Sequence, residues 1–180
     1  MIAGSGSVIA AVIHLPSLMT NRKSNQESLD RLRQDYASFI DENQRVEFFR
    51  TFVGDGDDLS GLSLPKTFFG RSEINNCSFA NTDLSESTMC WNDFVDVDFT
   101  DGDLTNSDLR ASNYSNVRFV RCDLKGADLR RSNFNNCDFA YADLEFATIT
   151  PDQVDMMNLT GEQLDSVNIS VDAGPEPYGG

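Results

Sequence analysis

Apolar side chains recur at every fifth position through the middle of the chain, from Leu59 to Ile149. A period of five matches neither an α-helix, which repeats every 3.6 residues, nor a strand, which alternates every two. It predicts a turn-rich coil in which each five-residue segment forms one side and buries its central residue. The central positions are Leu59, Leu64, Phe69, Ile74, Phe79, Leu84, Met89, Phe94, Phe99, Leu104, Leu109, Tyr114, Phe119, Leu124, Leu129, Phe134, Phe139, Leu144 and Ile149.

The residues before each central position also follow a pattern. The residue two positions earlier is mostly small, as at Ser107, Cys122 and Ala127, and the residue one position earlier is mostly Asp or Asn. A small residue beside a large one suits a narrow interior, whereas Asp and Asn suit a solvated surface where they can bond nearby backbone groups. We therefore expect each side to bury one large and one small residue and to leave three residues in water.

A second period, of twenty residues, sorts the central positions into uniform columns. Two of these columns are Phe79, Phe99, Phe119 and Phe139, and Leu64, Leu84, Leu104, Leu124 and Leu144. Such uniformity follows if residues twenty apart stack directly on one another, at the spacing of about 4.8 Å between adjacent strands. The two periods together predict a coil with four sides of five residues each.

Two segments, Ala127–Arg131 and Ala142–Phe146, read Ala-Asp-Leu followed by two variable residues. They resemble the A(D/N)LXX signature of the pentapeptide-repeat family. The family's fold, a right-handed quadrilateral β-helix, is what this resemblance implies for residues 54–150. The predicted fold class is an all-β solenoid of this kind with an N-terminal α-helical cap.

The N-terminal part of the chain carries a different pattern. Ser24 starts a capping-box pattern ahead of apolar residues at helical spacing, which predicts an α-helical cap over residues 23–53. A solenoid end needs a cap because it exposes unpaired backbone groups and apolar side chains. Phe68, at an outward position of the first coil, is a candidate contact for this cap. Residues 1–22 are expected to be an apolar, partly disordered segment, a poor signal peptide and too interrupted to span a membrane.

The repeat weakens after Ile149. Thr150 followed by Pro151 predicts a helix start, so we expect a short helix over residues 151–157 and then an irregular end, within a C-terminal cap of residues 151–170. The alternative is that the five-residue spacing continues, through Val154, Leu159, Leu164 and Ile169.

The remaining features of this end are a tail and two outward aromatic residues. Residues 171–180 are rich in Gly and Pro and are expected to be disordered. Tyr141 and Phe146 are candidate contacts of the C-terminal cap or of a dimer.

The composition restricts the possible partners. The 180-residue chain has a formal net charge of −15. Such a surface disfavours direct binding to nucleic acid or anionic membranes and favours partners with a basic surface. The four cysteines form no CxxC pair and the one histidine is distant in sequence, so we expect neither a metal site nor a cofactor. Reduced thiols, three of them buried as small residues, predict a cytoplasmic protein.

One acidic column could carry chemistry. The residues Asp83, Asp103, Asp123 and Asp143 are expected to stack on one face of the coil. Carboxylates can bind a cation or act in acid–base catalysis, but the repeat places Asp or Asn at this position on every side. We therefore assign the acidic face to the repeat itself. Without a histidine beside a Ser or Cys nucleophile, the sequence predicts a binding protein and not an enzyme.

The candidate partner-binding residues are basic or aromatic residues at outward positions, where an otherwise acidic surface is expected. Aromatic and Arg side chains dominate binding hot spots. The alternatives are that the arginines pair with adjacent Asp residues and that the N-terminal helix covers the tryptophan. The candidates are Trp91, Arg110, Arg130, Arg131, Arg118 and Arg121.

Three functions agree with these features. The most general is protein–protein interaction through a rigid acidic surface, by a monomer or a homodimer. The resemblance also implies a DNA mimic that binds DNA gyrase or topoisomerase, because some members of the family bind gyrase and protect it from quinolones. The polar C-terminus and the N-terminal extension depart from those members. The third is an immunity protein that neutralises a bacterial toxin with a basic, nucleic-acid-binding surface.

Overall fold

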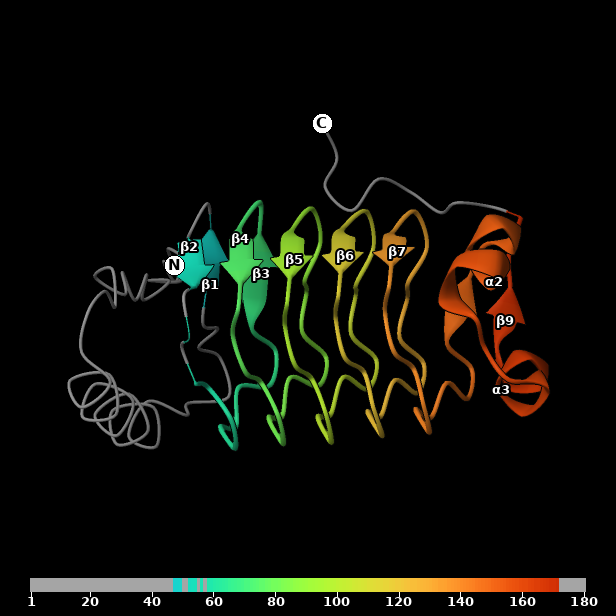
Figure 1. Ribbon diagram of the computed structural model, residues 1–180, viewed down its shortest axis with the longest axis horizontal. Coiled ribbons are helices and arrows are strands. Elements are labelled where there is room, and N and C mark those ends of the chain that lie inside the picture. Colours follow the sequence, from blue (N-terminus) through green and yellow to red (C-terminus); the bar gives the residue numbers. More distant parts are fainter. Residues whose placement is uncertain (1–46, 50–51, 55, 57, 172–180) are drawn as a thin grey trace, which may run out of the picture.

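The protein is a short solenoid whose coils stack along one axis (Figure 1). The computed structural model describes residues 47–49, 52–54, 56 and 58–171. Short strands mark the same side of successive coils, and two short helices lie at the C-terminal end of the stack (Figure 1).

Backbone pairing joins residues twenty positions apart, which confirms a coil of twenty residues on four sides. Parallel bridges link Asp83 to Asp103 on one side and Thr88 to Asp108 on the next. We name the four sides, in chain order, the Leu side, the arginine side, the strand side and the Phe side. Each side includes the corner residue that follows it. Their central residues are Leu64, Leu84, Leu104, Leu124 and Leu144; Phe69, Met89, Leu109, Leu129 and Ile149; Ile74, Phe94, Tyr114 and Phe134; and Leu59, Phe79, Phe99, Phe119 and Phe139. The arginine side therefore lies opposite the Phe side.

The strand side carries a parallel sheet. Its central residues are β-branched or aromatic, types that favour extended backbone. The pairing is in register, with Phe94 between Ile74 and Tyr114. The strands, in sheet order, are β2 (Phe52–Gly54), β4 (Glu73–Asn75), β5 (Asp93–Val95), β6 (Asn113–Ser115) and β7 (Asn133–Asn135).

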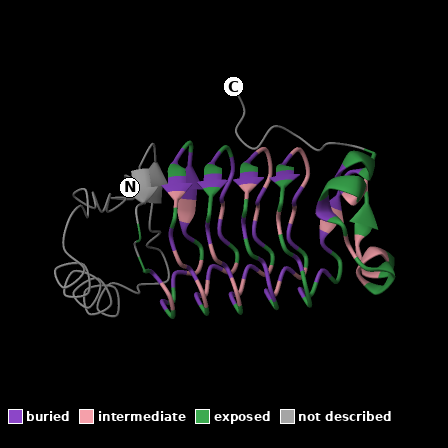
Figure 2. Cartoon of the chain, viewed as in Figure 1, coloured by how far each residue is buried: buried purple, intermediate pink, exposed green. Residues whose placement is uncertain are grey.

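The interior is filled by the central residues and the small residues two positions before them (Figure 2). The aromatic rings of the Phe side stack with centroids 4.8 to 5.4 Å apart. Those of the strand side stack at 4.9 and 5.1 Å and meet the Phe side edge to face. Such ring pairs contribute about 0.5–1.5 kcal/mol each beyond their burial. The prediction that each side buries one large and one small residue is confirmed.

The corners between sides are made by residues with left-handed backbone, two positions after the central residues from Leu59 to Leu144. Asn and Asp adopt this conformation readily, as at Asn76 and Asp96. Bulky residues in this region cost of order 1–3 kcal/mol. Trp91, Tyr141 and Phe146 nevertheless occupy such corners, each with a φ of 61°. The turn itself therefore does not explain why these three positions are aromatic.

Polar side chains of the repeat form hydrogen bonds with backbone groups of the same coil or of the preceding one. Asp98 Oδ1 accepts a hydrogen bond from the backbone N–H of Thr100 at 2.8 Å, and the same bond recurs at the equivalent Asp of other sides. At the small position, Ser112 Oγ donates to the carbonyl oxygen of Met89 in the preceding coil at 2.9 Å. The preference for Asp and for small polar residues thus follows from the fold.

The solenoid begins earlier than the sequence predicts. The strands β1 (Glu47–Phe49) and β2 begin within residues 23–53, which are assigned above to the helical cap. β1 pairs in parallel with β3 (Phe68–Gly70), and β2 pairs with β4. The prediction of helix is therefore wrong for this part of the cap. The rest of the predicted cap, the apolar segment before it and any cap contact of the half-buried Phe68 lie outside the described residues.

The sequence does not reveal these two strands because their five-residue repeat is offset by one residue from the repeat that starts at Leu59. Glu47 pairs with Phe68, twenty-one residues later, whereas Asp58 bridges to Ser78, twenty residues later. One extra residue therefore lies between Gly54 and Asp58. A strict five-residue count back from Leu59 does not reach Phe48 and Val53, which are five apart and pair with central positions.

The C-terminal end is more regular than predicted. The helix α2 spans Pro151–Met157, as the sequence indicates, and a second helix, α3, spans Gly161–Ser166. The chain then forms β9 (Asn168–Ile169), which pairs with β8 (Thr148–Ile149) at the usual twenty-residue spacing. The expectation of an irregular end is therefore wrong. Residues 172–180, the predicted tail, lie outside the described residues.

Two glutamines close the hydrogen-bond ladder at this end. Gln153 Nε2 donates to the carbonyl oxygens of Leu129 and Ser132 at 2.7 and 2.8 Å, and its Oε1 accepts from the backbone N–H of Thr150. Gln163, ten residues later, makes the same three bonds at the start of α3. Each side-chain amide thus satisfies carbonyl groups that would otherwise face the missing next coil.

We expect Gln153→Met to lower the free energy of unfolding by about 1–3 kcal/mol, because it preserves the side-chain length but removes the bonds to the carbonyl oxygens of Leu129 and Ser132 and to the backbone N–H of Thr150. Urea denaturation would measure this change. Asp155→Ala, at an exposed position of the same helix, is the control and should change stability by less than about 0.5 kcal/mol. Equal stability of the two variants would contradict the capping role.

Candidate partner-binding surface

Charge is distributed unevenly over the four sides of the coil. Counted over residues 58–151, the Leu side carries six carboxylates and two lysines, the strand side three carboxylates and no cation, and the Phe side four aspartates and two arginines. The arginine side carries four arginines and two aspartates. Within the described coil it is therefore the one side with an excess of positive charge. These arginines are Arg71, Arg110, Arg130 and Arg131.

Two of these arginines are engaged in an ion-pair network. Arg110 donates from Nε and Nη2 to the two oxygens of Asp108 at 2.7 and 2.6 Å, and Arg130 does the same to Asp128 at 2.8 and 2.6 Å. Arg110 Nε also lies 3.5 Å from Asp128, so the network is continuous between coils. Their side chains are only 12% and 17% exposed. The structure thus supports pairing with adjacent Asp residues, the alternative to partner binding.

The electrostatics of the network agree with this geometry. Burial opposes ionisation of Asp108, but the hydrogen bonds and charge of Arg110 outweigh it and hold the pKa of that carboxyl below its usual value. The hydrogen bond to Asp108 in turn raises the pKa of Arg110. Both groups are therefore ionised at neutral pH.

The other predicted arginines do not gather at one place. Arg118 and Arg121 belong to the Phe side, opposite the arginine side. Arg121 makes two bonds of 2.6 Å with the carboxylate of Asp101, and Arg118 lies in a column between Asp98 and Asp138. The six candidates therefore belong to two opposite sides and form no single cluster.

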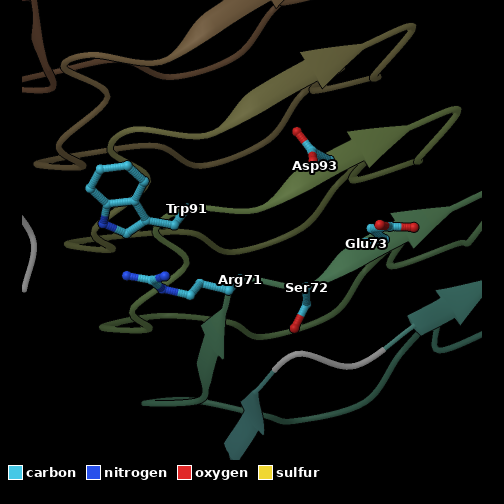
Figure 3. A pocket seen from close by; sticks show the side chains of 5 residues that line it. All are labelled: Arg71, Ser72, Glu73, Trp91 and Asp93. Carbon is cyan, nitrogen blue, oxygen red and sulfur yellow. The ribbon is translucent and has the colours of Figure 1, made fainter.

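Trp91 lies at the corner between the arginine side and the strand side, beside an open pocket of about 320 Å³. The side chain of Arg71 lies below the indole at the same corner of the preceding coil, and Glu73 and Asp93 stand across the pocket on the strand side (Figure 3). Ser72 lies between the two walls (Figure 3). The residue is 40% exposed, and it is the single tryptophan of the chain.

The floor of this pocket is held rigidly. The backbone N–H of Ser72 donates to Asn92 Oδ1 at 2.9 Å, and Asn92 Nδ2 donates to the carbonyl oxygen of Phe69 at 3.1 Å. On the strand side, Asn113 Nδ2 donates to Asp93 Oδ1 at 2.7 Å, and Asn133 donates in turn to Asn113. These bonds fix the orientation of the Asp93 carboxylate.

The sequence alone indicated Trp91 but missed the rest of the pocket. Arg71 stands twenty residues before Trp91 and Glu73 twenty before Asp93, so the twenty-residue columns bring each pair together. Applying that period to the outward residues, and not only to the buried ones, would have found them.

The acidic column on the Leu side is accounted for by the repeat. Asp103 and Asp123 each accept a hydrogen bond from the backbone N–H two residues later. Lys125 lies 3.3 Å from Asp123 and 2.7 Å from Asp143, and its hydrogen bond lowers the pKa of Asp143. No group of three or more potential metal ligands occurs among the described residues.

The four cysteines are free thiols, and three of them are buried, as predicted. Burial raises the pKa of Cys90, Cys122 and Cys137 above the usual value of a thiol. The thiolate is the reactive form, so these three thiols are less reactive than a cysteine of ordinary pKa.

The outward aromatic residues near the C-terminal end are not covered. Tyr141 is 86% exposed and Phe146 63% exposed. The expectation that their side chains pack under the C-terminal cap is therefore wrong. Phe146 contacts the cap through its backbone: its N–H donates to the carbonyl oxygen of Ser166, and its carbonyl oxygen accepts from Asn168 Nδ2. The role of Tyr141 and Phe146 as dimer contacts stays a prediction.

Helices able to cross a membrane, which need both length and apolar character, do not occur in the part of the chain that the structure describes.

Comparison with known proteins supports the repeat. The family model described as pentapeptide repeats matches in eight copies, over residues 72–110, 93–131 and 118–150. No curated protein matches the chain.

Several solved structures match the chain at low similarity. One is a pentapeptide repeat protein from the thylakoid lumen of Arabidopsis thaliana, with 21% identity, coverage of 62% of this chain and 71% of that one, and a TM-score of 0.43. Another, from the cyanobacterium Cyanothece 51142, has 15% identity, coverage of 72% and 95%, and a TM-score of 0.41. The plasmid-mediated fluoroquinolone resistance protein QnrB1 has 13% identity, coverage of 70% and 82%, and a TM-score of 0.28. Values this low assign no function.

We expect Asp108→Asn to lower the free energy of unfolding by about 1–3 kcal/mol at pH 7, because Arg110 loses its ionised partner. The pKa of Asp108 is lower in the folded protein than in the unfolded chain, so its ionisation stabilises the fold above about pH 4. This contribution disappears as the pH falls through the folded pKa, so the two proteins should become more alike in acid.

Thermal unfolding between neutral and acidic pH would measure this difference. Asp103→Asn is the matched control, because Asn keeps the bond to the backbone N–H of Thr105 and Asp103 has no arginine partner among the described residues. A pH-independent difference for Asp108→Asn would contradict the role of its charge.

Proposed function

The chain belongs to the pentapeptide-repeat family through residues 72–150. We propose that it is a non-enzymatic binding protein and that it contacts a protein partner through the corner at Trp91. The observation that carries the proposal is an exposed indole on a left-handed corner. Trp is a poor residue for that backbone conformation, and residues kept in unfavourable conformations concentrate at functional sites.

The surroundings of Trp91 support this choice. The repeat explains the acidic column on the Leu side, and Arg110 and Arg130 are already bonded to neighbouring carboxylates. The pocket instead brings together the indole of Trp91, the guanidinium of Arg71 and two carboxylates. Aromatic and Arg side chains are enriched in binding hot spots. Because the arginine side differs in charge from its neighbours, a partner can also be oriented on it electrostatically.

Affinity capture from the source organism tests this proposal. We expect a partner that is retained by the wild-type protein and lost with Trp91→Asn, a substitution that suits the left-handed corner. Tyr141→Asn is the matched control, because Tyr141 is also an exposed aromatic residue on a left-handed corner, diagonally across the coil. Partners lost equally with both variants, or with neither, would exclude the Trp91 corner as the binding surface.

A second candidate function is mimicry of DNA towards DNA gyrase or topoisomerase. It is favoured by the three contiguous acidic sides, which surround the coil except at the arginine side. Under this hypothesis the partner contacts carboxylates of the Leu and Phe sides, and Trp91→Asn has no effect.

A supercoiling assay with DNA gyrase, with and without a quinolone, separates the two candidates. Mimicry predicts that micromolar protein inhibits supercoiling or protects it from the drug, and that neutralising Asp83, Asp103 and Asp143 removes the effect. An unchanged gyrase reaction would reject mimicry and leave the Trp91 corner as the candidate surface.

A further inference from the structure

We infer that the pocket beside Trp91 receives an arginine side chain of the partner, stacked on the indole and bonded to the carboxylates of Glu73 and Asp93. The inference rests on the function proposed above and specifies the chemistry that the corner recognises.

The charges that line the pocket favour a cation. Glu73 and Asp93 contribute two negative charges against the one positive charge of Arg71. The strand side to which both carboxylates belong carries no Lys or Arg within the described coil. The net charge of −15 adds a long-range attraction for basic groups.

The shape of the pocket favours a guanidinium group over an ammonium group. Trp91 and Arg71 lie on one side of Ser72, and Glu73 and Asp93 lie on the other (Figure 3). A planar guanidinium can stack on an aromatic face and at the same time donate along its edge to carboxylates. A compact ammonium group, by contrast, acts as a point charge and reaches one wall at a time.

The pocket is also prepared for such a ligand. Asp93 uses Oδ1 to accept from Asn113, which orients the carboxylate without consuming both of its oxygens. Arg71 makes no ion pair with either carboxylate across the pocket within the described structure, so the two acidic groups retain their charge for a ligand. A site held in its binding geometry before the ligand arrives loses less entropy on association.

The single tryptophan of the chain makes the test direct, because intrinsic tryptophan fluorescence reports on this pocket alone. The probes are N-acetyl-arginine amide, its neutral isostere N-acetyl-citrulline amide, and N-acetyl-glutamate amide as the opposite charge. We expect a saturable change in Trp91 fluorescence with the arginine probe, at least tenfold weaker binding of the citrulline probe and no binding of the glutamate probe. Added salt should weaken the arginine response.

Two double variants identify the groups responsible. Glu73→Gln with Asp93→Asn should weaken the arginine response at least tenfold, while Asn at position 93 still accepts the bond from Asn113. Asp98→Asn with Asp138→Asn makes the same change of net charge on the Phe side and should leave the response unchanged. Thermal unfolding of both variants checks that the fold is intact.

The results separate this inference from the proposed function. An equal response to arginine and citrulline, a response to glutamate, or equal loss in the two double variants would overturn the inference. A partner that depends on Trp91 while the arginine probe fails to bind would support the proposed function and reject the arginine. Arginine binding without a partner that depends on Trp91 would support the pocket and reject the proposed function.

Discussion

Backbone hydrogen bonds hold each coil on the next and pair residues twenty positions apart, and this parallel ladder constrains every side chain of the solenoid. Adjacent strands lie about 4.8 Å apart, so equivalent residues must tolerate direct stacking. Phe on Phe and Leu on Leu satisfy this requirement in the core. At the surface, like charges do not, and two arrangements relieve the crowding. Asn113 relays hydrogen bonds from Asn133 to Asp93, and Lys125 lies between two aspartates of its column.

The same constraint explains how much of the fold could be predicted from the sequence. The ladder repeats the chemistry of the core every five and twenty residues, so the number of sides, the buried residues and the role of the Asp column follow from the periods alone. The two missed strands lie before one extra residue in the chain, which puts them out of frame with the five-residue count from Leu59. The helix α3 was missed because its start, Thr160 to Gln163, contains no apolar repeat. It is instead a second copy of the Thr-x-x-Gln arrangement that begins α2.

The candidate site was harder to predict, for a physical reason. Apart from the Asp or Asn before each central residue, outward residues are not selected by the ladder, so their pattern carries no periodic signal. Trp91 stands out because an aromatic residue is unusual there, but Arg71 and Glu73 have ordinary surface character and become part of a pocket only through stacking. Conversely, Arg110 and Arg130 look like binding residues in the sequence, whereas each forms a two-point bond with the Asp two positions earlier. A surface arginine in such a repeat therefore has to be judged together with its neighbours in the column.

The unbroken count of twenty across α2 and α3 has a consequence for how such a chain can change its length. The two helices replace sides of the last coil, yet Asn168 still pairs with Thr148. A gain or loss of one whole coil leaves every later face in line with the earlier ones, whereas a gain of five residues turns all later faces by a quarter of a circle. Genes of this type can therefore lengthen or shorten by duplicating or deleting whole coils, and a corner such as that of Trp91 and Arg71 survives only where the two coils that build it remain adjacent.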